Sequence, residues 1–461
     1  MTMIDWLLVL VSLLALYFIA VLVLKRVGFF EKYNLSLYGP ALMFRTKRGI
    51  GFLKRLAKRK RFWKSYGNFG IGFCIIAMIC MVSVFVFQFW MLIYELQPQE
   101  RANLPGLRFA LALPGINPVL PLEYTFYILL AFVVAIIVHE FSHGILSIAE
   151  RIKVKSLGLL YFIIPVGAFC EPDEKELEEA KIGKRMRVYS AGPLSNFAVA
   201  FAVLLLFSFV FMSAVQPIGG AHVLSNFEDS PAGEISLSTG SVITSLNDTK
   251  LDSPNEFSTA ISNTSPNQTV NITYIYRRET FNKQVELTNK YDFYVEHDVD
   301  KEKLNKSLKN NSFLGVNFVN VDYFVSSLKR PISYDFPGSF LVLYGLPFLG
   351  YQGYNPIASP FNEALIVQGP LSAIPTPLFW AITTALFWIL WLNLLVGLFN
   401  VLPMGPLDGG FLFKDAIGAV ILKLRKNISE ERKEKLVQRI SFTVSLIVLF
   451  LVLMPFFAKY I

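Results

Sequence analysis

The stretch Val138-His139-Glu140-Phe141-Ser142-His143-Gly144 lies in the second half of an apolar run from Tyr124 to Ile148. This run is long enough to cross a bilayer, which takes about 20 residues of helix. Residues four apart lie on one face of a helix, so His139 and His143 present two imidazoles to the same side. Such a pair can bind zinc, and Glu140 can accept a proton from water, as in the HExxH pattern of metal-dependent hydrolases. Because ionisable groups are costly inside a membrane, the stretch indicates a functional site.

A structural role for these side chains is the alternative, because a helical histidine in apolar surroundings is commonly packed and hydrogen-bonded. The chain contains four histidines, and two of them, His139 and His143, fall in this one stretch. A chance match is the risk with any short motif. With histidine so rare in the chain, the pairing favours a metal site.

The composition indicates an integral membrane protein. Hydrophobic residues make up 54% and aromatic residues 15% of the 461 residues, and the mean hydropathy is +0.48. The three cysteines, Cys74, Cys80 and Cys170, form no CxxC pair, which gives no support to a disulfide framework or a cysteine-type zinc finger. The apolar run that begins close to Met1 has no basic leader, and we interpret it as a retained span rather than a cleaved signal peptide.

Six apolar segments reach spanning length. They are Trp6 to Leu24, Gly70 to Tyr94, Tyr124 to Ile148, Val188 to Val215, Leu378 to Leu402 and Ile440 to Phe457. Lys and Arg gather in cytoplasmic loops, and the loop from Lys25 to Lys64 contains thirteen of them against the single acid Glu31. We therefore expect this loop in the cytoplasm, together with the loops 151–187 and 410–439, and the N-terminus outside. We assign the basic residues to topology and to attraction toward anionic lipid headgroups rather than to nucleic acid, since no nucleic-acid-binding fold is apparent.

The polar segment 216–375 would then lie outside the cytoplasm. Its first part contains strand-like runs, such as Val270 to Tyr276, separated by Gly, Pro and Asn turns. The Ser230-Pro231-Ala232-Gly233-Glu234 turn, the strand within Thr239 to Asn247 and the helical segment Phe257 to Ile261 resemble a PDZ domain of the type found in bacterial and archaeal proteases. A PDZ groove takes up an extended peptide as an added strand, so the resemblance implies a substrate filter.

A third zinc ligand has to come from another part of the chain, because a catalytic zinc takes three protein ligands and keeps one position open. The fifth apolar segment ends in Asn400-Val401-Leu402-Pro403-Met404-Gly405-Pro406-Leu407-Asp408-Gly409-Gly410, where prolines and glycines end the helix. Non-helical backbone at membrane depth is tolerated where it lines a protein or water cavity. Asp408 is therefore an available carboxylate ligand.

The HExxH motif, the NxxPxxxxDGG pattern that ends at Gly410 and the PDZ-like segment between them resemble a site-2 protease. Proteins of this family are intramembrane zinc metalloproteases that cleave membrane-anchored proteins within or near their transmembrane helix. The stretch Ser190 to Asn196 resembles the AGPxxN signature of the same family, and the resemblance covers roughly residues 122–440. In this family a hairpin that corresponds to Leu157 to Cys170 dips into the membrane and pairs with the substrate as a strand.

The resemblance implies a role for each motif residue. His139, His143 and Asp408 would bind zinc, with Glu140 as general base and acid. Asn196 and Asn400 would position the peptide or help to stabilise the oxyanion. The alternative for both asparagines is a hydrogen bond between packed membrane helices.

We therefore expect a polytopic α-helical membrane protein of about six transmembrane helices with an inserted extracytoplasmic PDZ-like α+β domain. The expected divisions are an N-terminal membrane region (1–121), the first part of the catalytic membrane core (122–215), the PDZ-like domain (216–295), an insert of unknown structure (296–376) and the second part of the core (377–461).

The expected function is zinc-dependent hydrolysis of single-pass membrane protein substrates in the cell membrane, with the active site near the cytoplasmic face. The partners would be these substrates, an extended peptide in the PDZ-like groove and the lipid bilayer, with no nucleic acid. A non-proteolytic PDZ-containing membrane adaptor with a structural zinc is the alternative from a different class. A metal-ion transporter is a third, which a single ionisable cluster near one face does not favour.

Overall fold

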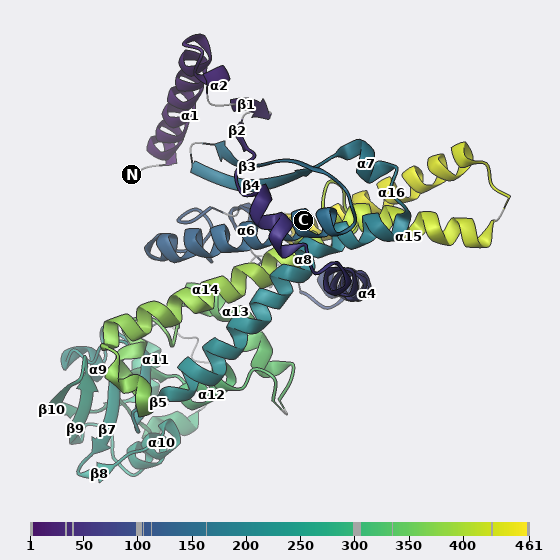
Figure 1. Cartoon of the computed structure of the whole chain (residues 1–461). Coiled ribbons are helices and arrows are strands. Elements are labelled where there is room, and N and C mark those ends of the chain that lie inside the picture. Colours follow the sequence, from purple (N-terminus) through teal and green to yellow (C-terminus); the bar gives the residue numbers. More distant parts are fainter. Residues whose placement is uncertain are drawn as a thin grey trace. The chain divides into compact units, whose positions relative to one another are not determined.

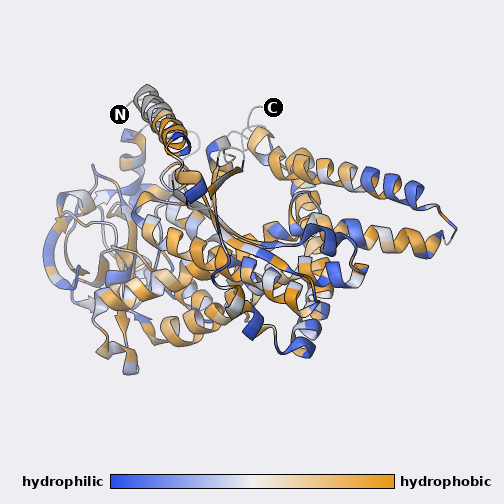
Figure 2. Ribbon diagram, turned by 45° about the horizontal axis from the view of Figure 1, so that its top comes forward, coloured by the Kyte–Doolittle hydropathy of each residue, from blue (hydrophilic) through white to orange (hydrophobic). Residues whose placement is uncertain are grey.

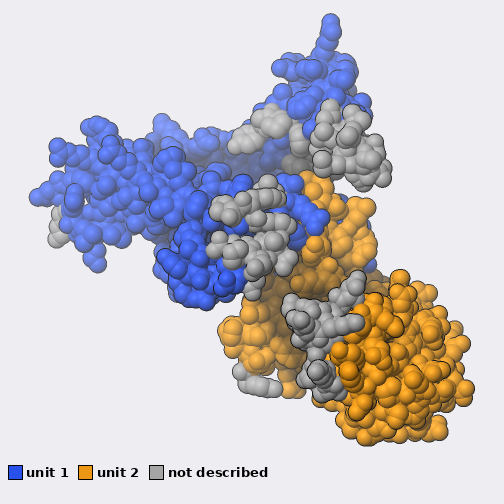
Figure 3. Space-filling view, turned by 180° about the vertical axis from the view of Figure 1, so that it is seen from behind, with its two compact units in different colours: residues 1–112, 125–201, 389–461 blue, residues 113–124, 202–388 orange. Residues whose placement is uncertain are grey.

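The computed structural model describes residues 3–32, 35–38, 41–97, 104, 106–111, 113–162, 164–297, 306–333, 335–425 and 427–458. The chain divides into two compact units, which Figure 3 colours separately. Unit 1 comprises residues 1–112, 125–201 and 389–461, and unit 2 comprises residues 113–124 and 202–388.

Long helices dominate unit 1, and Figure 2 shows apolar residues along most of their length. In chain order the long and short α-helices of unit 1, most of them labelled in Figure 1, are α1 (Met3–Arg26), α2 (Phe29–Lys32), α3 (Ile50–Leu56), α4 (Lys60–Tyr94), α6 (Thr125–Ala149), α7 (Glu174–Glu178), α8 (Ile182–Leu205), α14 (Thr376–Asn400), α15 (Asp408–Leu424) and α16 (Glu430–Ala458). Two of them, α8 and α14, cross the division between the units.

Five helices in the described part of the chain are long and apolar enough to cross a membrane. They are Lys60–Tyr94, Leu122–Ala149, Ile182–Ala214, Thr376–Asn400 and Glu430–Ala458. These are the second to sixth of the expected segments, whereas the crossing of α1, a helix of 24 residues, stays a prediction. Two of the five, α4 and α16, begin well before the expected apolar runs because Lys, Arg and Glu have good helix propensity and extend the helix beyond the apolar stretch.

A four-stranded antiparallel sheet also belongs to unit 1, in the order β1-β2-β3-β4. Its strands are β1 (Leu35–Tyr38), β2 (Ala41–Thr46), β3 (Val154–Phe162) and β4 (Ile164–Pro172). The hairpin expected over Leu157 to Cys170 is formed by β3 and β4. The basic loop from Lys25 to Lys64, for which no strands were expected, contributes β1 and β2, and β2 pairs with β3 from Leu42↔Tyr161 to Thr46↔Leu157.

The sheet, α3, α6 and α8 enclose one apolar core. Leu53 of α3, Leu146 of α6 and Leu157 of β3 are buried there with Cys170 of β4 and Val188 of α8. The helix α6, which carries the HExxH motif, thus packs against both the β3–β4 hairpin and α8.

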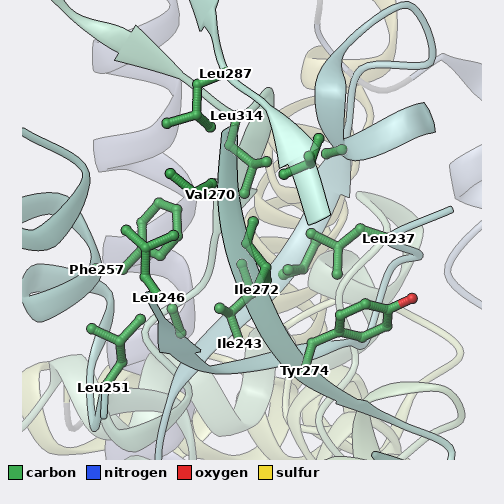
Figure 4. Packing of buried hydrophobic residues seen from close by; sticks show 14 residues of the cluster. Leu237, Ile243, Leu246, Leu251, Phe257, Val270, Ile272, Tyr274, Leu287 and Leu314 are labelled. Carbon is green, nitrogen blue, oxygen red and sulfur yellow. The ribbon is translucent and has the colours of Figure 1, made fainter. Parts of the chain in front are cut away.

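Unit 2 contains a six-stranded antiparallel sheet in the order β10-β9-β7-β6-β13, with β8 paired to β7. The strands are β6 (Ala221–Asn226), β7 (Val242–Leu246), β8 (Thr249–Lys250), β9 (Thr269–Tyr276), β10 (Glu279–Glu286) and β13 (Val316–Phe318). Figure 4 shows how Ile243, Ile272 and Phe257, the last from helix α10 (Pro254–Ser262), meet in its core. The sheet continues past the expected boundary at residue 295, because β13 pairs with β6.

Smaller elements complete unit 2. They are η2 (Leu122–Tyr124), η3 (Leu206–Phe211), η4 (Met212–Ala214), β5 (Val215–Pro217), α9 (Pro231–Glu234), β11 (Thr288–Asn289), α11 (Lys290–Glu296), η5 (Lys306–Asn310), β12 (Ser312–Phe313), α12 (Val321–Lys329), α13 (Gly338–Tyr351), η6 (Phe361–Ala364), β14 (Leu365–Val367) and η7 (Gly369–Ala373), while η1 (Leu107–Ala110) belongs to unit 1. Within the segment 296–376, whose structure the sequence did not indicate, residues 298–305 and 334 lie outside the described residues.

Candidate metal centre

Three potential metal ligands converge in unit 1. The Asp408 Oδ2 atom lies 2.9 Å from His139 Nε2 and 3.1 Å from His143 Nε2, and all three ligand atoms lie within 4.8 Å of one another. Both histidines are buried, and the side chain of Asp408 is 17% exposed. The helix α6 supplies the two imidazoles from one face, because one turn separates them, and α15 supplies the carboxylate at its first residue.

Hydrogen bonds at the Nδ1 atoms, which face away from Asp408, hold both imidazoles in an orientation suited to metal binding. The N–H at Nδ1 of His143 donates to the carbonyl oxygen of Val188 at 2.8 Å, and the N–H at Nδ1 of His139 donates to Oδ1 of Asn196 at 3.2 Å. With these tautomers each Nε2 keeps its lone pair and faces Asp408. Such outer hydrogen bonds are the usual way in which proteins fix the tautomer and ring orientation of a metal-binding histidine.

A glycine of α8 makes room for the two histidines. A Cβ atom added at Gly192 would lie 2.6 Å from His139 Nε2 and closer still to His143 Nε2. Glycine in a helix interior costs about 1 kcal/mol relative to alanine, so its presence here needs a packing reason. The reason is that any side chain at this position would enter the space in front of the two ligand nitrogens.

The turn between α14 and α15 places Asp408. A Cβ atom at Gly410 would lie 2.7 Å from the Met404 carbonyl oxygen, and one at Gly409 would overlap the Val401 carbonyl. The backbone of the α15 N-terminus can therefore approach the turn only with glycines at both positions. The DGG sequence thus brings the first residue of α15 close to the end of α14.

Glu140 is half-buried beside the ligands. It follows His139 directly in α6, and its Oε2 accepts a hydrogen bond of 2.9 Å from the backbone N–H of Cys170 in β4. The hairpin therefore orients one carboxylate oxygen of Glu140, a contact that the HExxH pattern does not reveal.

The two asparagines have different surroundings. Asn196 is fully buried, and while its Oδ1 accepts from His139, its Nδ2 donates to the Ala135 carbonyl at 3.4 Å. Asn400 is the last residue of α14, and its Nδ2 donates to the Val396 carbonyl at 3.0 Å within the same helix. The structure thus brings Asn196, rather than Asn400, into hydrogen-bond contact with a ligand residue.

Gly192 and the backbone N–H of Cys170 contribute to the site, and the sequence alone assigned no role to either. A glycine inside a long apolar helix is a signal that could have indicated Gly192. The Cys170 contact depends on how the hairpin packs against α6, and a backbone N–H leaves no mark in the residue types.

The donor set and spacing fit zinc. Two imidazole nitrogens and one carboxylate oxygen are the type of three-ligand set that leaves a fourth position for water or substrate. Ligand atoms about 2.0 Å from a tetrahedral zinc lie roughly 3.3 Å apart. The two distances from Asp408 to the histidines, 2.9 Å and 3.1 Å, are close to this value, and all three ligand atoms lie within 4.8 Å of one another.

Comparison with known proteins places these residues in context. Residues 127–448 match the model of peptidase family M50. The chain is 26% identical over 400 residues to an uncharacterized protein of Methanocaldococcus jannaschii, covering 86% of this chain and 83% of that protein. It is 27% identical over 292 residues to the zinc metalloprotease RasP of Shouchella clausii, covering 62% of each. Among solved structures, the PDZ domain of an SdrC-like protein from Listeria monocytogenes matches 23% of this chain and 94% of that domain, with 23% identity and a TM-score of 0.18.

Proposed function

The chain belongs to peptidase family M50, the site-2 protease family, and on this premise we propose that it hydrolyses peptide bonds of membrane-anchored proteins within or near their transmembrane segments. Its membership makes it a zinc-dependent metalloendopeptidase. The observation that carries the proposal is the convergence of His139, His143 and Asp408 beside Glu140 in a helix of membrane-spanning length.

His139, His143 and Asp408 would hold the zinc ion through Nε2, Nε2 and a carboxylate oxygen. When bound, zinc supplies Lewis-acid polarisation of a carbonyl oxygen and of water. Asn196 and the Val188 carbonyl would keep the imidazoles in the binding tautomer. For Asn196, these contacts favour a role in orienting His139 over the peptide-positioning role that the family motif implies.

Glu140 would act as general base and then as general acid. Its carboxylate accepts a proton from the attacking water and delivers it to the nitrogen of the leaving amine. The Cys170 N–H holds one oxygen, so the other oxygen is the one that would exchange the proton. Asn400, at the end of α14, remains the candidate for a contact with the peptide or the oxyanion.

The substrate would meet the site as an extended strand. A helix hides its carbonyls in hydrogen bonds, so the substrate has to unwind locally before it can be cleaved. The strand β4 ends the order of its sheet and carries the Cys170 N–H that contacts Glu140. Added to the outer edge of β4, the substrate backbone would run past the catalytic carboxylate. Helix-breaking residues in a substrate span should therefore favour cleavage.

The proposed topology places the site near the cytoplasmic face and the N-terminus outside. Strand β2 comes from the basic loop after α1, and β3 comes from the loop after α6. The pairing of these strands supports a topology in which both loops lie on the same side of a membrane, as the positive-inside rule predicts for two cytoplasmic loops. The β6-containing sheet would then lie on the opposite side.

That sheet would select substrates as a PDZ-like domain. Its edge strand β13 follows Gly315, whose φ is +85°, and Phe318 of β13 contacts Phe257 of α10 with ring centroids 4.8 Å apart. An edge strand beside a helix can receive an extended peptide as a further strand. The domain would admit single-pass substrates according to the peptide that they present outside the cytoplasm.

Metal analysis of His139→Ala and Asp408→Ala tests the proposal in the purified protein. We expect each variant to lose about one zinc per chain together with cleavage of a model membrane substrate. Zinc loss accompanied by unchanged binding of partner proteins, with the unmodified protein also failing to cleave, would instead support an adaptor with a structural zinc.

A further inference from the structure

The helices α8 and α15 contact each other directly at two positions in matched register, and at a third position both lie against His139 and His143 of α6. Arg185, Tyr189 and Gly192 lie on one face of α8, at spacings of four and three residues. Asp408, Phe411 and Asp415 lie on one face of α15, at spacings of three and four. Arg185 pairs with Asp415, Tyr189 stacks on Phe411, and Gly192 adjoins the histidines that contact Asp408.

We call the aligned contacts of α8 and α15 the α8–α15 ladder, and the Arg185–Asp415 pair lies at its end away from Asp408. This pair is strong. Arg185 Nε donates to Asp415 Oδ2 at 2.9 Å and Nη2 donates to Oδ1 at 2.6 Å. The side chains are only 22% and 10% exposed. A bidentate guanidinium–carboxylate pair fixes both distance and orientation, and partial burial limits its screening by water.

Arg185 is itself anchored. Its Nη1 donates to the carbonyl oxygens of Glu178 at 2.8 Å and Ala180 at 3.4 Å, just before α8 begins. The guanidinium therefore cannot follow α15 if that helix shifts. Tyr189 and Phe411 fill the space between the two ends of the ladder, with ring centroids 5.3 Å apart and planes inclined by 24°.

We infer that Arg185 and Asp415 are positioning residues for the zinc site, which set the register of α15 along α8 and thereby hold Asp408 against His139 and His143. This inference rests on the proposed role of Asp408 as a zinc ligand. Asp408 and Asp415 are seven residues apart, or roughly 10 Å along the helix. Because a helix is stiff over two turns, sliding or rotation at Asp415 moves the carboxylate of Asp408 by a similar amount, and zinc–ligand distances tolerate only about 0.2 Å.

Zinc affinity of the full-length protein in detergent, measured by competition with a chelator, tests this inference. We expect Asp415→Asn to weaken zinc binding by at least about tenfold, the lower end of what loss of outer support costs a metal site. If the two residues act through one pair, the double variant Arg185→Lys/Asp415→Asn should bind zinc about as weakly as Asp415→Asn alone. The control Glu431→Gln removes an ion pair with Lys435 whose side chains are 67% and 77% exposed, and it should leave zinc affinity unchanged.

Two outcomes would overturn the positioning role: unchanged zinc affinity in Asp415→Asn, or losses in Arg185→Lys and Asp415→Asn that add up in the double variant. If Asp415→Asn fails to fold, Arg185→Lys decides the matter, because lysine keeps the charge but loses the bidentate geometry. It should weaken zinc binding several-fold, and unchanged affinity would contradict the inference.

Asp408→Ala in the same titration separates this inference from the proposed function. If Asp408→Ala binds zinc normally, the proposed ligand set fails. If Asp408→Ala loses zinc while Asp415→Asn and Arg185→Lys retain it, only the positioning role fails.

Discussion

Replacement of Gly192 by alanine should remove zinc without weakening the fold. The added Cβ would lie 2.6 Å from His139 Nε2, so the imidazole would have to retreat by about 1 Å to reach ordinary van der Waals contact. That displacement is several times the roughly 0.2 Å within which zinc–ligand distances vary. The same crowding affects His143, so the site loses the geometry of two ligands at once.

The expected effect is a loss of zinc affinity of at least about 100-fold, which corresponds to about 2.7 kcal/mol. The stability of the metal-free protein should change little, because the gain of about 1 kcal/mol from alanine in a helix interior offsets much of the cost of about 1 kcal/mol or more of crowding against the imidazoles. Chelator competition measures the first quantity, and thermal unfolding of the metal-free protein in detergent measures the second.

Gly183→Ala is the matched control, since Gly183 also lies in α8 and a Cβ there would meet only the far end of Arg187, at 3.8 Å. It should leave zinc affinity unchanged. Normal zinc binding by Gly192→Ala would refute the reasoning, because it would mean that the two Nε2 atoms do not need the space in front of Gly192. A metal-free Gly192→Ala protein that unfolds far more easily than Gly183→Ala would show that the glycine serves packing alone.

Three further predictions concern other parts of the chain. Arg187→Met should lower the free energy of unfolding by about 3 kcal/mol in a denaturant titration, because the buried Glu150, 1% exposed, would lose the Arg187 Nε at 2.7 Å, its closest partner. The double variant Arg187→Met/Glu150→Leu should recover most of this loss, and no recovery would contradict the prediction. Burial lowers the pKa of His222 below its usual value of 6.5, so the unfolded chain binds more protons than the folded chain. The strand β6 should therefore lose hydrogen-exchange protection as the pH falls through 6.5, and this loss should be less steep in His222→Gln. Equal pH dependence of the protection in both proteins would contradict the prediction. Gly315 has φ +85°, and a Cβ added there would overlap Ser230. Gly315→Ala should therefore lower the free energy of unfolding by about 2 kcal/mol and reduce hydrogen-exchange protection in β6 and β13, while the zinc content stays the same. Unchanged exchange protection would contradict the role of β13 in the sheet.

The sequence was most informative where chemistry restricts residue types. His139, His143 and Asp408 could be predicted to converge because few other groups bind zinc and because the glycines and prolines around Asp408 end a helix. The long apolar runs predicted five helices that the structure contains, since length and hydropathy alone decide whether a helix can span a bilayer.

Elements that depend on pairing with distant parts of the chain were not predictable in this way. Strands β1 and β2 lie within a basic loop, and β3, with which β2 pairs, is more than 100 residues away in sequence. Strand β13, with three residues, is too short to show an alternating pattern. The contact of Asn196 with His139 and the pair of Arg185 with Asp415 depend on how helices pack, which residue types do not specify.

The cleavage rate of Glu140→Gln tests the proposed mechanism most directly. The purified variant and the unmodified protein would be reconstituted in lipid vesicles with a single-pass substrate, and cleavage would be measured together with zinc content. Glutamine preserves size and can still accept the Cys170 N–H, but it cannot take up a proton, so we predict one zinc per chain and a loss of cleavage of at least about 100-fold. Cleavage by Glu140→Gln at the rate of the unmodified protein would contradict the assignment of Glu140 as the catalytic base.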